Sequence, residues 1–511
     1  MQLKNKLSTF QLILFSTGGM IGSGWLFSPF YGFQTAGIWV ILSWLITAFL
    51  TLIIALSFAE TSCLLPIVGG VSRFIGVTNN KTIAFIFMML GWLSLVVYLP
   101  LEAQSAIQYL GFWWKGLVIH DGNRIILSNL GLVTAVCIML FLTILNCFLI
   151  SKVTKINSFM GVWKILIPIA VALFFILFYG KWSHITGNFH RTPFSFEHVL
   201  LAITSSGLAF AFTGFQNGIV MSQETKNPKK SLPLSLFSPI VFGSIIYILL
   251  SLSFICCLSD PKQITNSAVA PLLGLVALFG INIIYIILFT DAILAPLGTA
   301  NVYTAITGRV LYGLALDFMP KSILTRLNRH HAPYICLWLS AIIGTCFLFP
   351  FPTWSELVDF LSSVVVFAYI SGPIALIVLR LEFPELKRNF RVRCYHLLGY
   401  TGFAFCGLFI YWSGFKNLFL LSLALLITVA IYAIITKNFI KVIIDSIILI
   451  LYVFAMTLIS YLHAQKMISF PLDNLLIILI SIISCKLLVK TRLSNNEIKD
   501  NLVRLNLEFK D

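Results

Sequence analysis

Four glycines interrupt the first apolar run of the chain, which covers about residues 10–31. Residues 18–24 of this run read GGMIGSG. If the run crosses a membrane, all its backbone N–H and C=O groups need partners inside the protein, so a glycine cluster there requires a reason. An unwound stretch would present free amides and the N-terminus of a half-helix, and both bind carboxylates. The alternative is an unbroken helix whose small residues let another helix pack closely.

A second interrupted stretch lies five apolar runs later. Residues 210–218 read FAFTGFQNG and fall inside the run 197–222. Broken helices at corresponding positions of two structural repeats mark the central site of secondary transporters. The pair therefore predicts a transporter whose substrate lies between the two stretches, with five membrane spans in each repeat.

Charged residues also stand inside other apolar runs, among them Lys164, Asp291 and Glu102. A charge within a membrane span is costly and indicates a function by default. A desolvated lysine loses and regains a proton more readily than an exposed one, so we expect Lys164 to exchange a proton during transport. The alternative is that Lys164, about two turns inside the expected cytoplasmic end of its span, extends to the lipid headgroups.

The acids in apolar runs other than Asp291 have less defined roles. Glu102 lies toward the outer end of its run, after Pro100. It would serve an outer gate or a proton relay, or else face the membrane surface as an interfacial carboxylate. We expect Glu60 to make a structural contact near the cytoplasmic end of its run. Asp359 and Asp445 are single acids in apolar runs, without an assigned role.

The composition explains where these residues must lie. Of the 511 residues, 59% are hydrophobic and 10% are charged, whereas a soluble protein carries about 25% charged residues. Lipid must therefore cover most of the surface. The ten cysteines include no CxxC pair and the histidines are scattered, so we expect no disulfide, no metal site and no cofactor.

Fourteen apolar stretches are candidates for membrane helices, which take about 20 residues each. They lie near residues 10–31, 38–64, 82–108, 128–150, 158–179, 197–222, 234–258, 272–299, 334–350, 355–380, 397–414, 418–436, 440–462 and 471–489. Only a short turn at 413–417 separates the eleventh stretch from the twelfth. The prediction is an all-α polytopic membrane protein with short loops.

The basic residues test this count and set an orientation. With the N-terminus in the cytoplasm, 26 of the 34 lysines and arginines fall in cytoplasmic segments, seven fall in outer segments and Lys164 falls within a span. Such a bias is the positive-inside pattern of multi-pass proteins. It predicts a cell-membrane protein with cytoplasmic N- and C-termini. It also explains the net charge of +16 without a nucleic-acid partner.

Several of these stretches resemble the amino acid–polyamine–organocation (APC) permeases. In chain order, the matching stretches are residues 19–27 (GMIGSGWLF), 59–60 (AE) with 66–70 (PIVGG), 224–233 (ETKNPKKSLP), and 309–315 (RVLYGLA) with 319–320 (MP). They resemble the family's first helix, the end of its second helix, and its loops after helices 6 and 8. Trp25 and the four additional C-terminal stretches resemble the branch that contains bacterial aspartate–proton symporters.

The resemblance implies the LeuT-like fold, an inverted repeat of five plus five helices in which helices 1 and 6 are broken. The core of ten helices would occupy residues 1–380, with repeats at about 8–180 and 195–380. Residues 381–511 would form four further helices and a short cytoplasmic tail. The oligomeric state and the role of the four helices stay open.

The resemblance also implies a substrate site between the broken helices. In the family, the first broken helix holds the substrate carboxylate and carbonyl groups of the second hold its ammonium group. The matching residues are Ile21, Gly22, Ser23 and Gly24 in the first, and Phe210, Phe212, Thr213 and Gly214 in the second. Phe210 would cap the substrate; the alternative for Phe210 and Phe212 is ordinary helix packing. Gln216 stands where some relatives carry an acidic residue and is a candidate for a gate or relay.

Lys164 matches a lysine whose ammonium group, in sodium-independent relatives, stands where sodium binds in sodium-coupled ones. The resemblance therefore implies proton coupling. Because helices 5 and 8 are neighbours in the implied fold, we expect Lys164 and Asp291 to interact directly or through water. The alternative is that Asp291 faces a polar cavity alone.

The leading hypothesis is a secondary active transporter that moves an amino acid with protons by alternating access, driven by the proton gradient. An amino-acid exchanger or polyamine carrier on the same fold is the alternative, and a nutrient sensor on this scaffold also stays open. An enzyme is not expected, because no histidine cluster or carboxylate pair has a catalytic spacing. The sequence does not identify the amino acid.

Overall fold

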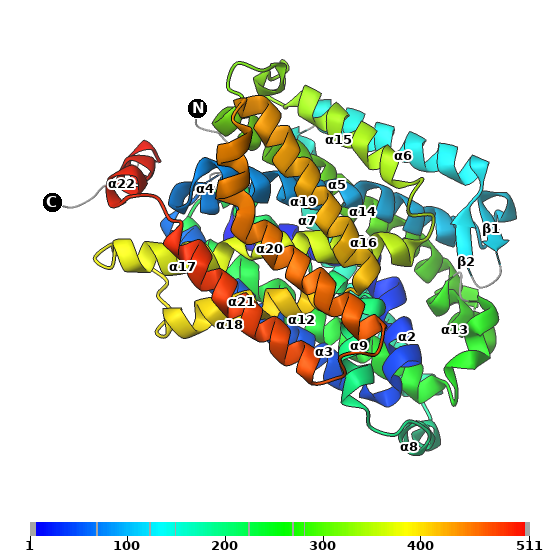
Figure 1. Ribbon diagram of the computed structural model, residues 1–511. Coiled ribbons are helices and arrows are strands. Elements are labelled where there is room, and N and C mark those ends of the chain that lie inside the picture. The colour runs from blue at the N-terminus through cyan, green and yellow to red at the C-terminus, as the bar shows by residue number, and fades with distance from the viewer. Residues whose placement is uncertain are drawn as a thin grey trace.

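The computed structural model describes residues 7–67, 70–121, 124–148, 150–222, 225–267, 270–280 and 282–505. Within these ranges the chain is almost entirely helical (Figure 1). This arrangement follows from the long apolar runs, because a helix pairs its backbone groups within a single segment.

The first half of the chain contains twelve α-helices within the described residues. Their bounds are α1 Thr9–Met20, α2 Gly24–Ala36, α3 Val40–Leu64, α4 Ile75–Thr78, α5 Lys81–Leu110, α6 Asn129–Phe148, α7 Ile150–Tyr179, α8 Trp182–Arg191, α9 Phe196–Ser205, α10 Leu208–Ala211, α11 Asn217–Val220 and α12 Pro228–Cys257.

The second half continues in the same manner. The bounds are α13 Pro271–Phe279, α14 Asn282–Phe318, α15 Tyr334–Phe347, α16 Trp354–Tyr369, α17 Ser371–Glu382, α18 Tyr395–Trp412, α19 Phe415–Thr436, α20 Phe439–Ala464, α21 Leu472–Lys490 and α22 Asn495–Arg504.

Short elements connect these helices. They are the 3₁₀ turns η1 Gly37–Trp39, η2 Val71–Arg73, η3 Lys115–Leu117, η5 Pro261–Ser267 and η6 Ile323–Thr325, and the antiparallel hairpin of β1 Val118–Asp121 and β2 Arg124–Leu127. The hairpin was not expected, and it is a small addition to an otherwise all-α protein.

The expectation of an all-helical multi-pass membrane protein is confirmed. In the described chain, ten segments are long and apolar enough to cross a membrane by length and composition. Several of the fourteen expected stretches are not single long helices. The first is divided between α1 and α2, the sixth among α9, α10 and α11, and the ninth forms the 14-residue α15.

Some expected boundaries were wrong. The eighth stretch, 272–299, is not one helix, because Gly280 at φ 68° ends α13 and α14 then continues to Phe318. Likewise α7 begins at Ile150, well before the expected residue 158. The expected division near residues 413–417 is present, since Gly414 at φ 85° lies between α18 and α19.

The long helices α5 and α14 pack against each other through the middle of the molecule. Helix α5 is buried on nearly all sides, with α16, α15, α6 and α19 as further neighbours. Helices α20 and α21 run side by side across the front of the molecule in Figure 1. Many of their outward side chains are large and apolar, which suits a surface in contact with lipid.

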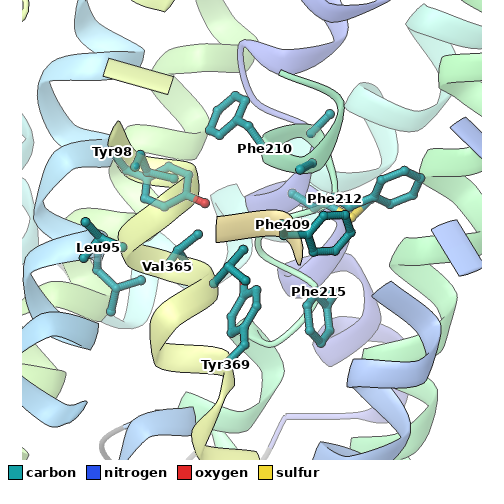
Figure 2. Close-up of a cluster of buried hydrophobic side chains, with 14 of the residues drawn as sticks. Leu95, Tyr98, Phe210, Phe212, Phe215, Val365, Tyr369 and Phe409 are labelled. Carbon is teal, nitrogen blue, oxygen red and sulfur yellow. The ribbon is translucent and has the colours of Figure 1, made fainter. Parts of the chain in front are cut away.

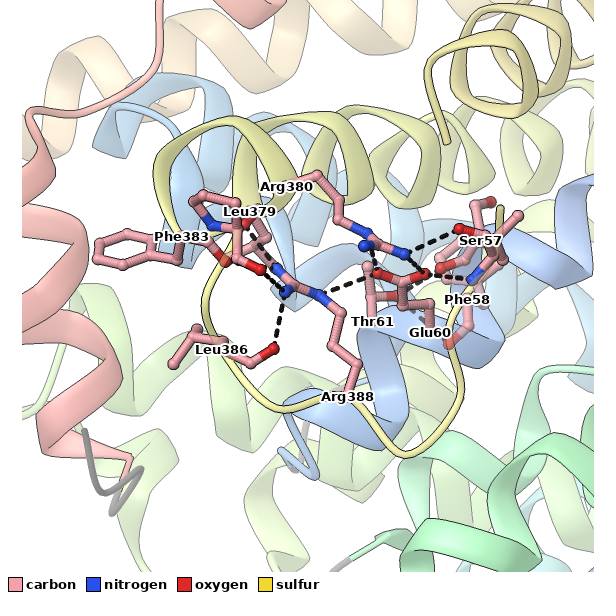
Figure 3. A network of polar contacts seen from close by, with 11 residues as sticks. Ser57, Phe58, Glu60, Thr61, Leu379, Arg380, Phe383, Leu386 and Arg388 are labelled. Carbon is pink, nitrogen blue, oxygen red and sulfur yellow. Dashed lines mark hydrogen bonds and ion pairs between the residues drawn. The ribbon is translucent and has the colours of Figure 1, made fainter. Parts of the chain in front are cut away.

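A buried ionic cluster holds the end of α3 against α17 and the loop that follows it (Figure 3). Glu60 Oε1 lies 2.6 Å from Arg380 Nε and 3.0 Å from Arg388 Nε. The second oxygen of Glu60 accepts hydrogen bonds from Arg380 Nη2 at 2.9 Å and from the backbone N–H of Val392 at 2.8 Å. Glu60 therefore makes the structural contact expected from the sequence.

Arg388 also supports the loop backbone of this cluster. It donates hydrogen bonds to the carbonyl oxygens of Leu379 and Phe383, both at 2.8 Å, and to that of Leu386 at 2.9 Å. Burial and the neighbouring Arg380 guanidinium lower the pKa of Arg388, and Glu60 opposes that shift. The Glu60 carboxylate thus contacts two buried cations at once.

Replacing Glu60 tests this cluster. Glu60→Ala leaves two buried guanidinium groups without the carboxylate that contacts both, so the free energy of unfolding should fall by about 3–5 kcal/mol. The measurement is unfolding of the purified protein in detergent. Glu382→Ala is the control, because it removes the more exposed ion pair with Arg492 and should cost no more than about 1 kcal/mol. Equal losses in the two variants would contradict a dominant role for Glu60.

Candidate functional site

The glycine cluster in the first apolar run breaks the helix as expected. Helix α1 ends at Met20 and α2 begins at Gly24, so residues 21–23 are not helical. The N–H of Gly22 bonds to the carbonyl oxygen of Met20 at 3.0 Å, not to that of Gly18 four residues earlier. The Gly18 carbonyl therefore needs another partner.

The second expected interruption is also present. Helix α10 ends at Ala211 and α11 begins at Asn217, so residues 212–216 form an irregular connection. Gly214 adopts φ 104°, a conformation that favours glycine. Its N–H donates to Oε1 of Gln216 at 2.9 Å, so a side chain replaces a helical partner.

The two broken segments lie directly against each other. A Cβ atom at Gly214 would lie 2.9 Å from Cα of Met20, and a Cβ atom at Gly24 would lie 3.2 Å from Cα of Ala211. Glycines at these two positions therefore allow backbone-to-backbone contact. The two stretches between which the sequence predicts the substrate site therefore meet at one junction.

Lys164 reaches this junction from α7. Its Nζ donates hydrogen bonds to the Gly18 carbonyl at 2.8 Å and to Oγ1 of Thr299 at 2.6 Å. Oγ1 of Thr299, on α14, also lies 3.2 Å from the carbonyl oxygens of both Gly18 and Ile21. Lys164 is 1% exposed, so the alternative of extension to the lipid headgroups is wrong. Lysine and threonine together supply the donors that the interrupted helix lacks.

Glu102 approaches the same break from α5. Its Oε2 accepts a hydrogen bond from the Ser23 N–H at 2.9 Å. Ser23 is the N-cap of α2, where a carboxylate is favoured by the free amides and the helix dipole. Glu102 is 0% exposed, so the alternative of an interfacial, surface-facing carboxylate is wrong. The position of Glu102 in the sequence indicated its depth in the membrane, but it did not indicate which face of α5 carries it.

Aromatic side chains close the α2 side of the junction. Trp354 on α16 donates from Nε1 to Oγ of Ser23 at 2.9 Å. The ring of Phe210 lies 5.9 Å from that of Trp354 and 5.8 Å from that of Tyr98. Phe210 therefore lies beside the first break, where a capping residue is expected.

Phe212 points away from this junction. Its ring packs against Trp44 on α3 and Tyr247 on α12, at centroid distances of 5.8 and 5.6 Å. Figure 2 shows Phe210 near Tyr98, with Phe212 directed to the other side of the connection. The side chain of Phe212 thus packs against neighbouring helices, as the alternative interpretation held, and only its backbone faces the connection. The irregular backbone turns consecutive side chains in directions that helical spacing does not predict.

Hydroxyl and amide groups line the α1 side of the junction. Thr213 Oγ1 is hydrogen bonded to the Tyr98 hydroxyl and lies 2.6 Å from the Phe210 carbonyl oxygen. Tyr98 stacks on Tyr303 with ring centroids 3.6 Å apart. Gln216 Oε1 also accepts a hydrogen bond from the hydroxyl of Tyr369 at 2.8 Å.

A cavity continues from this polar layer toward η2. Its volume is about 20 Å³, which is room for about one water molecule. Most of its lining is apolar, and its polar groups come from Ser72, Ser94, Gln216, Asn217 and Tyr369. The cavity therefore extends the junction toward one end of the bundle.

Asp291 does not form the direct ion pair that was one expectation. Its Oδ1 accepts a hydrogen bond from Nε1 of Trp163 at 2.6 Å, and no ion pair with Lys164 within 4.0 Å occurs among the described residues. Trp163 and Lys164 are consecutive on α7 and point in different directions, one to Asp291 and the other to α1. The carboxylate still lies close enough to interact electrostatically with Lys164.

Sequence reasoning missed Thr299, Trp354, Tyr98 and Tyr303. Hydroxyl and indole groups occur throughout apolar helices, so their presence alone is a weak signal. Thr299 is the clearest case, because it lies two turns from Asp291 on the same helix and contacts both Lys164 and the first break. In the described part of the chain, no three His, Cys, Asp or Glu side chains are grouped as a metal site would require.

Comparison with known proteins adds evidence that is independent of this geometry. The family model described as "Amino acid permease" matches residues 7–417. The glutamate/serine transporter AimA of Bacillus subtilis is 31% identical over 98% of this chain and 96% of its own length. The aspartate–proton symporter of the same organism is 27% identical over 81% of this chain and 80% of its own length. The branched-chain amino acid permease BcaP of Bacillus subtilis is 27% identical over 84% of this chain and 92% of its own length.

Replacing Gly214 tests the contact between the two breaks. In Gly214→Ala, the left-handed conformation costs about 1–2 kcal/mol, and the new methyl group also meets the Met20 backbone at 2.9 Å. Gly414→Ala is the matched control, because Gly414 has φ 85° but no atom within 4 Å of a built Cβ. Thermal unfolding in detergent should show the larger loss for Gly214→Ala. Equal losses would mean that the two breaks do not constrain each other.

Proposed function

This chain belongs to the amino acid permease family, and we propose that it is a proton-coupled amino acid symporter that works by alternating access. It is a transporter and not an enzyme. The proposal follows the expectation from sequence, with the substrate held between the breaks of α1–α2 and α10–α11. The names of its relatives, which include an aspartate–proton symporter, support both amino acid transport and proton coupling.

The single observation that carries the proposal is the contact between two unwound helix segments inside an apolar bundle. Residues 21–23 and 212–216 are irregular, and glycines bring their backbones together. Free amides at the start of α2 suit a carboxylate, and carbonyl groups at the end of α10 suit an ammonium group. An amino acid carries both groups one carbon apart, so it can bridge the two segments.

In this proposal the residues around the junction have separate roles. The backbone at Ile21, Gly22, Ser23 and Gly24 binds the substrate carboxylate, while carbonyl groups of residues 210–214 bind its ammonium group. The ring of Phe210 covers the substrate, and Gln216 with Tyr369 closes the other side. The small cavity beyond Gln216 lies on the side from which the substrate would leave for the cytoplasm.

Proton coupling is assigned to Lys164. As an ammonium group it donates to Gly18 O and to Thr299, and both contacts hold the first break in its present shape. After loss of the proton, the neutral amine has one donor fewer and holds the break less firmly. Protonation therefore biases the conformation of α1 at the substrate site. The Asp291 carboxylate, which accepts a hydrogen bond from Trp163, interacts electrostatically with the Lys164 ammonium group and thereby affects its protonation.

The finer topology is also part of the proposal. It comprises the inverted repeat of five plus five helices, the fourteen spans, and the four additional C-terminal helices. The distribution of lysine and arginine supports cytoplasmic N- and C-termini. In that orientation, α1 and the small cavity would face inward and α2 with Trp354 would face outward.

Reconstitution into liposomes tests the function. Purified protein should accumulate at least one of L-glutamate, L-aspartate, L-serine or L-leucine when the outside is acidic, even in vesicles that contain no amino acid. Uptake that requires internal amino acid would identify an exchanger, and uptake of putrescine alone would identify a polyamine carrier. Either result would overturn symport of amino acids.

Replacing Lys164 tests the coupling. Lys164→Ala should abolish accumulation, so that the internal amino acid concentration only reaches the external one, because an uncoupled carrier cannot use the pH gradient. Lys416→Ala is the control, since the side chain of Lys416 is 68% exposed and pairs only loosely with Glu356 at 3.7 Å. Undiminished accumulation by Lys164→Ala would show that Lys164 does not couple protons to transport.

A further inference from the structure

The position of Glu102 bears on how a substrate enters the site. Its Oε2 accepts the Ser23 N–H at 2.9 Å, and this N–H belongs to the segment proposed to bind the substrate carboxylate. The segment that would bind the substrate carboxylate thus already binds a carboxylate of the protein itself. A carboxylate from a substrate would need the same donor.

The other carboxylate oxygen of Glu102, Oε1, lies next to Gly22 of this segment. A Cβ atom at Gly22 would overlap Oε1 of Glu102, so only a glycine allows the carboxylate to lie here. Within the described residues, Oε1 has no hydrogen-bond partner, although it is fully buried. A buried, ionised carboxylate with one unsatisfied oxygen is costly, and protonation of that oxygen removes part of the cost.

Two ionised carboxylates do not fit on this segment together. Their mutual repulsion at this short separation, inside a medium of lower dielectric constant than water, disfavours that arrangement. Three other titratable groups interact electrostatically with Glu102: Lys164 on α7, Tyr247 on α12 and Tyr303 on α14. Of these, only the Lys164 cation attracts the carboxylate, and its two short hydrogen bonds go to Gly18 O and Thr299.

We propose that Glu102 is a tethered competitor of the substrate carboxylate. In its ionised form it occupies the Ser23 N–H and excludes the substrate. When it takes up a proton, its hold on the N–H weakens, the side chain swings aside, and the substrate carboxylate binds in its place. This inference rests on the proposed function and adds a second proton site to it, at the point where the substrate binds.

Competition of this kind links substrate affinity to pH. The apparent affinity is the intrinsic affinity multiplied by the fraction of protein in which Glu102 is protonated. Above the titration of Glu102, each pH unit therefore weakens binding by about tenfold, and one proton is taken up for each substrate bound. At acidic pH the affinity should reach a constant value.

Glu102→Gln is the decisive variant. The amide has the shape of the carboxyl group and can accept from the Ser23 N–H, but it cannot become an anion. Binding of radiolabelled L-glutamate, L-aspartate and L-serine to detergent-solubilised protein should be measured from pH 5 to pH 9. Native protein should show the tenfold change per pH unit, and Glu102→Gln should lose this tenfold slope and keep only the pH dependence that Lys164 imposes. Glu197→Gln, an exposed acid on α9, should keep the native slope.

The possible outcomes separate this inference from the proposed function. If Glu102→Gln keeps the native pH slope, the competition is refuted while amino acid binding stands. If native protein binds none of the three amino acids at any pH, the proposed function itself fails for this substrate class. A measurement on native protein alone covers the case in which the variant does not fold. Calorimetry at alkaline pH in two buffers of different ionisation enthalpy should give about one proton taken up per substrate, and zero protons would refute the competition.

Discussion

In an apolar bundle, every backbone N–H and C=O group must find a partner inside the protein. The three residues between α1 and α2 are where this chain meets the constraint with side chains. Lys164 and Thr299 satisfy the carbonyl groups at the end of α1, and Glu102 satisfies an N–H at the start of α2. The break therefore exists only because charged and hydroxyl groups from α5, α7 and α14 converge on it.

The same constraint joins the substrate site to its driving force. Each group that completes the broken backbone, apart from Thr299, can gain or lose a proton. A change in protonation of Lys164 alters the carbonyl side of the break, and a change in Glu102 alters the amide side. The substrate must use the same backbone groups, so its binding and the proton balance of the site depend on one another. The second break, fixed against the first through Gly214 and Met20, carries this dependence to α10 and α11.

Residues that disturb an apolar helix, either as a glycine cluster or as a charge, were the ones whose position could be predicted from sequence. The glycines at 18–24 and 210–218 predicted both breaks, and the charge of Lys164 predicted a buried functional position. Thr299 and Trp354 could not be predicted, because hydroxyl and indole groups are common in apolar helices. The direction of Phe212 and the side of α5 that carries Glu102 depend on tertiary packing, which periodicity does not determine. The boundaries at α7 and α13 failed because helices continue through short polar segments and end at single glycines such as Gly280.

A structure of the protein with an amino acid bound, determined by electron cryo-microscopy at acidic pH, tests this account most directly. The account predicts that the substrate carboxylate lies on the Ser23 N–H, that its ammonium group lies at the end of α10, and that the side chain of Glu102 has moved off Ser23. Lys164 should still contact the Gly18 carbonyl. A substrate bound elsewhere, or one bound while Glu102 still accepts the Ser23 N–H, would contradict the account.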